Sequence, residues 1–155
     1  MEQWISGMGE CTMEATRRFN INRGYMKLEV WRDSIQLLKL AHRIVHEGKT
    51  VDLRLKSQIL SSAQSVSANV AEGYCRKSIN EYLQYLHIAL GSLGEVLTRM
   101  IGLLQSNLIS ADSFESFDVI HYSVENKLLA LIRALQLKRK RGGWEDDLSQ
   151  TAKHA

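Results

Sequence analysis

The longest patterned segment of the chain is residues 78–107, which read SINEYLQYLHIALGSLGEVLTRMIGLLQSN. Its large apolar side chains recur at steps of about three and four residues, the spacing of one helix face: Ile79, Tyr82, Leu83, Leu86, Leu90, Leu93, Leu97, Met100 and Leu104. Ser78, followed three residues later by Glu81, is typical of a capping box at a helix start. The segment therefore predicts a helix roughly 45 Å long with one buried side.

Three other segments predict helices of the same kind, at about 28–46, at 53–72, and from Ser110 or Asp112 into the basic run 138–141. The apolar stripe of the first includes Trp31, Ile35 and Leu38. Asp52 is a candidate N-cap of the second, and Gly73 is expected to end it. His121, isolated in the third, is expected at the edge of a packed face. In this last segment, steps of three and four mark a bundle seam: Phe117, Ile120, Val124, Leu128, Leu131 and Leu135. No alternating β-branched run indicates a strand, and the chain contains no proline. Short connections make successive helices pack antiparallel. The predicted fold class is all-α, an antiparallel up-down four-helix bundle.

The 155 residues are enough for one domain with one core. Since 1–25 show no sustained periodicity, we expect a flexible extension there, the bundle over 26–141 and a C-terminal tail over 142–155. No secretory pattern opens the chain, and no apolar run approaches the ~20 residues that cross a bilayer. Cys11 and Cys75 stand alone, which indicates a reducing compartment. We expect a cytoplasmic protein without membrane association.

The segment 53–72 is unusual because small and polar residues line one of its faces. Gln58, Ser62, Ser65, Asn69 and Glu72 follow one another at steps of three and four, so they share a helix face. The simpler, structural interpretation is that the small residues of this face let two helices approach closely and that its polar residues form hydrogen bonds with a neighbouring helix. The alternative is a ligand or partner site. Catalysis has little support, since no histidine lies in register to act as a base for serine.

The segment 78–107 has a matching run of small residues, Ala89-Leu90-Gly91-Ser92-Leu93-Gly94-Glu95. Glycine inside a helix costs about 1 kcal/mol relative to alanine, so two of them suggest that another backbone comes very close. The predicted assembly or partner face combines both segments and consists of Ser65, Asn69, Glu72, Gly91, Ser92 and Glu95.

No residues are predicted to be catalytic or to hold a metal or cofactor. His42 and His46 lie one helical turn apart, a spacing that can bind zinc, but no third ligand is evident. The chain also contains no glycine-rich phosphate loop. We therefore expect a protein that is not an enzyme.

Several of these residues resemble a known family. The residues on which the resemblance rests are Leu28-Glu29-Val30-Trp31, Gln58-Ile59-Leu60, the run from Ser65 to Tyr74, and the run from Ala89 to Glu95. Together they resemble the bacterial four-helix-bundle proteins encoded in intervening sequences of 23S ribosomal RNA genes. That family is similar in turn to the accessory variability proteins of diversity-generating retroelements. The resemblance implies a homo-oligomeric ring, typically a pentamer, with a non-enzymatic role. In the retroelement branch it implies binding of RNA and a reverse transcriptase.

The predicted topology also locates the charge. The start of the first helix, the turn between the second and third, and the end of the fourth share one end of the bundle. We call this the basic end, since nine basic residues face four acidic ones there, whereas the opposite end has five against six. The predicted nucleic-acid-binding residues are Arg76, Lys77, Arg133, Lys138, Arg139, Lys140 and Arg141. The simpler interpretation is that the run 138–141 only caps its helix and aids solubility.

Two functional hypotheses follow. The first is a ring-forming accessory protein that binds RNA or DNA, with a reverse transcriptase as a candidate partner. The second is a structural scaffold that contacts only protein.

Overall fold

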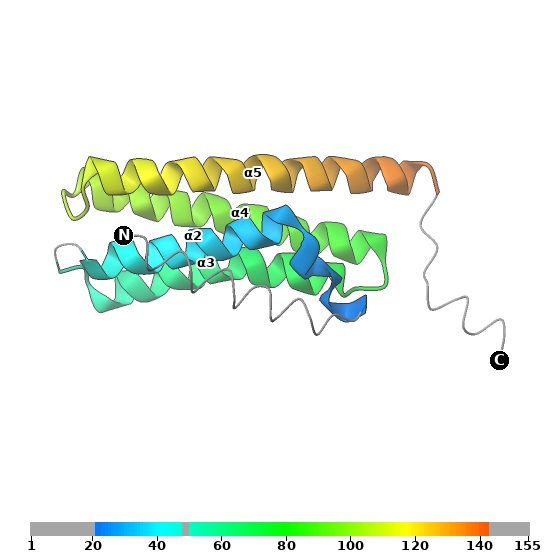
Figure 1. The fold of residues 1–155 in the computed structure, drawn as a ribbon, viewed down its shortest axis with the longest axis horizontal. Helices are drawn as coiled ribbons and strands as arrows, with labels where there is room; N and C mark the ends of the chain where they lie inside the picture. Colours follow the sequence, from blue (N-terminus) through cyan, green and yellow to red (C-terminus); the bar gives the residue numbers. More distant parts are fainter. Residues whose placement is uncertain (1–20, 48–49, 143–155) are drawn as a thin grey trace.

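The computed structural model describes residues 21–47 and 50–142. Within them the chain forms a short 3-10 helix and four long α-helices (Figure 1). The elements are η1 (Ile21–Lys27), α2 (Glu29–Glu47), α3 (Leu53–Tyr74), α4 (Ile79–Gln105) and α5 (Ala111–Lys140). The long helices contact one another in the cyclic order α2, α3, α4, α5, and successive helices run antiparallel. The predicted all-α four-helix bundle is confirmed.

Local side-chain bonds start three of the helices. Asp52 accepts the backbone N–H of Leu55 at 3.1 Å, and Ser110 accepts that of Ser113 at 3.1 Å. Such caps satisfy N–H groups that have no partner within the helix. Ser78 caps α4, although its hydroxyl accepts from Asn80 rather than from Glu81 as a capping box requires.

The core lies along the bundle axis and is filled by apolar side chains from all four long helices. The largest fully buried side chains include Leu37, Ile59, Leu86, Leu93, Met100, Phe117 and Leu128. His121 is buried among them with only 2% of its surface exposed, and its Nε2 lies 2.8 Å from the carbonyl oxygen of Leu93. This bond ties α5 to the middle of α4.

Two boundaries differ from those expected. The fold begins before Met26, because η1 contacts both α2 and α3. In addition, α3 does not stop before Gly73: it continues through Tyr74, and Cys75 caps it. The helix continues because Gly73 is buried at a contact with α4, so at this position glycine permits close packing instead of ending the helix.

By length and composition alone, α4 could cross a membrane, since an 18-residue window reaches a mean hydropathy of 1.2. The expectation that no segment reaches this length therefore needs correction. However, its large apolar residues Leu86, Leu93 and Met100 are fully buried in the bundle core. Packing against the other helices accounts for the hydropathy of α4.

Candidate nucleic-acid interface and assembly face

The basic end gathers residues from separate elements. The start of α2, the turn between α3 and α4, and the end of α5 lie at one end of the bundle (Figure 1). Arg139 donates from Nη1 to the Oδ1 of Asn80 at 3.1 Å, which ties the end of α5 to the start of α4. Six of the seven predicted nucleic-acid-binding residues are exposed, and Arg76 is partly buried. The structure therefore places the predicted residues at one end of the bundle.

The Arg76 guanidinium makes several contacts inside the chain. It pairs with Glu72, donates to the Tyr85 hydroxyl at 2.6 Å, and lies 4.7 Å from the centre of the Tyr85 ring. The hydrogen bond from Arg76 lowers the pKa of Glu72, and the bond to Glu72 raises the pKa of Arg76. Arg76 thus holds α3 against α4, and its charge is largely offset by Glu72.

An aromatic cluster lies beneath the basic end. Tyr25 meets Trp31 and Tyr74 edge to face, with ring centres 5.4 and 6.2 Å apart, and Tyr74 meets Tyr82 at 6.1 Å. Gly24 lies so close to Tyr74 that a Cβ atom there would be 2.0 Å from the hydroxyl. The cluster fixes η1 onto the bundle. Sequence reasoning missed it because the four rings come from four separate elements.

The predicted assembly face is built around a direct contact between α3 and α4. The Ser92 hydroxyl donates to the Ser65 hydroxyl at 2.8 Å. The Asn69 amide, one turn along, donates to the carbonyl and hydroxyl oxygens of Ser65 at 2.7 and 2.9 Å. These bonds support the interpretation that the small polar residues let two helices approach closely.

The same seam continues toward the opposite end of the bundle, which we call the far end. Arg99 donates to the Gln58 side-chain oxygen at 2.7 Å and to Glu95 at 2.6 Å. The Arg99 bond, followed by a bond from Ser62, lowers the pKa of Glu95. No buried side-chain nitrogen or oxygen in the described residues lacks a hydrogen-bond partner. The polar residues along the contact between α3 and α4 therefore find their hydrogen-bond partners within one chain.

The glycines of α4 do not lie in this seam. Gly91 and Gly94 are exposed, and a Cβ atom added to either would meet nothing within 4 Å. No other backbone in the described part of the chain comes close to them, because α3 contacts α4 through Ser92 instead. The glycine at a close contact is Gly73, where an added Cβ would lie 2.8 Å from the Tyr82 ring.

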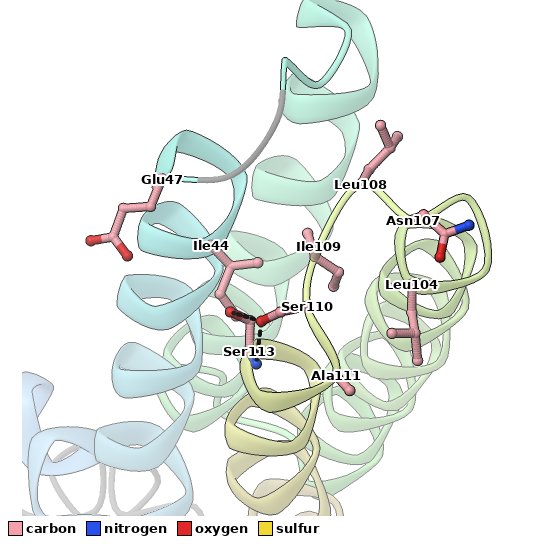
Figure 2. A pocket seen from close by; sticks show the side chains of 9 residues that line it. All are labelled: Ile44, Glu47, Leu104, Asn107, Leu108, Ile109, Ser110, Ala111 and Ser113. Carbon is pink, nitrogen blue, oxygen red and sulfur yellow. Dashed lines mark hydrogen bonds between the residues drawn. The ribbon is translucent and has the colours of Figure 1, made fainter.

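Neither a metal centre nor an enclosed reaction site is evident in the part of the chain that the structure describes. No three metal-ligating side chains meet there, and the rings of His42 and His46 stack on each other. A hollow at the far end is lined by Ile44, Glu47, Leu104, Asn107, Leu108, Ile109, Ser110, Ala111 and Ser113 (Figure 2). Its two serine hydroxyls bond each other, and Ser110 also caps α5 by accepting the backbone N–H of Ser113, so both serines have a structural role.

The comparisons with known proteins agree with this architecture. A solved structure of a protein of unknown function from the S23 ribosomal protein family, from Bacteroides thetaiotaomicron, is similar with a TM-score of 0.60. It is 23% identical, and the match covers 67% of this chain and 95% of that one. No match was found among curated proteins. The family model described as 23S rRNA-intervening sequence protein matches residues 26–130. The chain therefore belongs to the family of 23S rRNA-intervening sequence proteins.

Proposed function

We propose that the protein is a non-enzymatic accessory protein that assembles into a homo-oligomeric ring and binds RNA or DNA at its basic end. The observation that carries the proposal is the convergence of exposed basic residues from separate elements at one end of the bundle. A lone basic run could serve only as a helix cap. A helix cap does not require further basic residues in the α3–α4 turn at the same end of the bundle, so their presence there supports the proposal.

Assembly would multiply this charge. In a ring with parallel bundle axes, the basic ends of all copies lie on the same side. Five copies would bring together roughly 25 excess positive charges, which attract a phosphate backbone and release its counterions. The ring and its pentameric size come from the family resemblance, and so does the finer proposal that a reverse transcriptase of a retroelement is a partner. We place this role in the cytoplasm.

Removal of three charges from the basic end tests the proposal. The triple variant Lys138→Ala, Lys140→Ala and Arg141→Ala keeps Arg139 in place, so the bond from Arg139 to Asn80 still holds α5 to α4. We expect at least tenfold weaker binding of a mixed-sequence RNA at low salt, because each lost phosphate contact no longer releases a condensed counterion. The salt dependence of binding should fall as well. Fluorescence anisotropy measures the binding, and circular dichroism checks that the helices remain.

A matched variant controls for the change in net charge. Lys39→Ala, Arg43→Ala and Lys56→Ala also removes three positive charges, but from positions away from the basic end. This variant should bind RNA nearly as well as the unaltered protein. Equal weakening in both variants would mean that only net charge matters, and unchanged binding in the first would favour the protein-only scaffold.

A further inference from the structure

Three rings of the aromatic cluster stay partly exposed although they pack against one another. Tyr82, the fourth ring, is buried with 4% of its surface exposed, whereas Tyr25, Trp31 and Tyr74 are only partly covered. Rings that served only to fix η1 would gain by being buried as deeply as Tyr82, because burial removes apolar surface from water. Partly exposed aromatic side chains are typical of binding surfaces.

The contacts among these rings leave face-to-face stacking unused. Tyr25 meets the rings of Trp31 and Tyr74 at angles of 62° and 73°, so neither pair is stacked. A nucleobase binds an aromatic side chain by stacking on the face of its ring. Every base has such a face, so recognition of this kind tolerates any sequence.

Basic side chains accompany the rings along the chain. Each partly exposed ring has a basic residue within the next two positions: Lys27 after Tyr25, Arg32 after Trp31, and Arg76 after Tyr74. The Arg32 guanidinium donates from Nη2 to the carbonyl oxygen of Lys27 at 3.0 Å, which holds it at the end of η1. A guanidinium has five N–H donors, so this bond leaves others for a phosphate. Proteins that bind single strands combine cationic groups with stacking rings in this way.

The acidic residues nearby are largely paired within the chain. Lys127 of α5 bonds Asp33 at 2.5 Å and lies 3.6 Å from Glu29, and Arg76 pairs with Glu72. Around the rings, six basic residues face four acidic ones: Arg23, Lys27, Arg32, Arg76, Lys77 and Lys127 against Glu29, Asp33, Glu72 and Glu81. The basic run 138–141 at the end of α5 adds to this excess. The surroundings of the rings therefore attract a phosphate backbone.

We infer that the aromatic cluster stacks unpaired nucleobases, so that the basic end binds single-stranded rather than double-stranded nucleic acid. The inference rests on the proposed binding of nucleic acid at the basic end and names the class of strand. In a duplex the bases are stacked on one another inside the helix, so a duplex contacts only the basic side chains. A single strand places its bases on the rings and its phosphates on the basic residues beside them.

Trp31 provides a direct readout, because a base that stacks on an indole ring quenches its fluorescence. Trp4→Phe with Trp144→Phe leaves Trp31 as the only tryptophan of the full-length protein. Titration with a mixed-sequence RNA strand should quench its emission, whereas the same strand annealed to its complement should leave the emission nearly unchanged. At moderate salt, which screens phosphate contacts, fluorescence anisotropy should show that the single strand binds roughly tenfold more tightly than the duplex.

The variant Tyr25→Leu removes one ring and keeps an apolar side chain at the same position. Binding of the single strand should weaken roughly tenfold, the loss expected for one stacked base, while binding of the duplex should not change. Tyr122→Leu is the matched control, because Tyr122 is 64% exposed and lies on α5 away from the basic end. This control should bind both forms as the unaltered protein does. Single-stranded DNA of the same sequence should bind and quench as the RNA strand does, since both present base faces.

Other results would overturn the inference in distinguishable ways. If the protein binds neither form, the proposed function fails and the inference fails with it. If both forms bind alike and quench Trp31 alike, the basic end still binds nucleic acid but stacking is overturned. Equal weakening of both forms by Tyr25→Leu would mean that the ring only holds η1 in place, and quenching by RNA but not by DNA would assign recognition to the 2′-hydroxyl. Circular dichroism checks the helices, and the Trp31 titration, which leaves the cluster intact, decides the matter if Tyr25→Leu does not fold.

Discussion

Replacing Gly73 with valine is expected to destabilise the bundle by roughly 3 kcal/mol, near the upper end of what overpacking usually costs. A Cβ atom at this position would lie 2.8 Å from Cδ2 of Tyr82, 2.9 Å from Cβ of Tyr85 and 3.2 Å from the Tyr82 carbonyl oxygen. Tyr82 is buried and one of the three atoms belongs to the backbone, so the clash is relieved only if α3 and α4 separate. Chemical unfolding followed by circular dichroism measures the loss.

Gly102 in α4 provides the matched control. It is exposed and helical, and an added Cβ there meets nothing within 4 Å. Gly102→Ala should therefore stabilise the helix by up to about 1 kcal/mol, the difference in helix propensity between the two residues. If Gly73→Val were as stable as the wild type, α3 and α4 would not approach each other as closely as described.

Binding of RNA is expected to fall steeply as salt is added. A ring that contacts six or more phosphates should lose roughly a hundredfold or more in affinity between ~50 and ~200 mM salt, because each contact releases a condensed counterion. Plotting the logarithm of the binding constant against that of the salt concentration gives the number of contacts. The triple variant Lys138→Ala, Lys140→Ala and Arg141→Ala, which lacks three charges of the basic end, is predicted to show a shallower slope.

A slope near zero for the wild type would contradict electrostatic recognition by the basic end. A steep slope that is equal in the wild type and in the triple variant would show that the phosphates are contacted elsewhere than at the end of α5.

The extent of the helices could be predicted closely because the signals are local. Ser110 and Asp52 were identified as candidate caps from neighbouring residues alone, and each accepts the expected kind of backbone N–H. The basic end could also be predicted, since antiparallel order alone determines which helix ends meet. Each of these inferences needs only the spacing of residues along the chain.

How deeply each side chain is buried could not be predicted in the same way, because the periodicity shows which residues are apolar and not how much of each side chain the neighbouring helices cover. In α2 the expected stripe included Trp31, Ile35 and Leu38, which are only partly buried, whereas Ser34 is fully buried and donates to the Trp31 carbonyl oxygen at 2.7 Å. His121 was likewise expected at the edge of a packed face. A polar residue can be buried when its bond is satisfied, and sequence spacing does not show that.

Glycine was the other source of error. The sequence predicts a helix end at Gly73 and a close approach of another backbone at Gly91 and Gly94. The structure reverses these roles, with Gly73 at the contact and the α4 glycines facing outward. Composition cannot distinguish the two situations, because a glycine in a helix looks the same whichever side of the helix it faces.

The most direct test of the account is the mass of the full-length protein by size-exclusion chromatography with light scattering, at low and high salt, with and without a mixed-sequence RNA. If a ring presents the basic end to nucleic acid, the protein is a multimer at both salt concentrations, binds RNA at low salt and releases it at high salt. A monomer, or a multimer that does not bind RNA at low salt, would mean that no such ring exists or that the basic end does not bind nucleic acid.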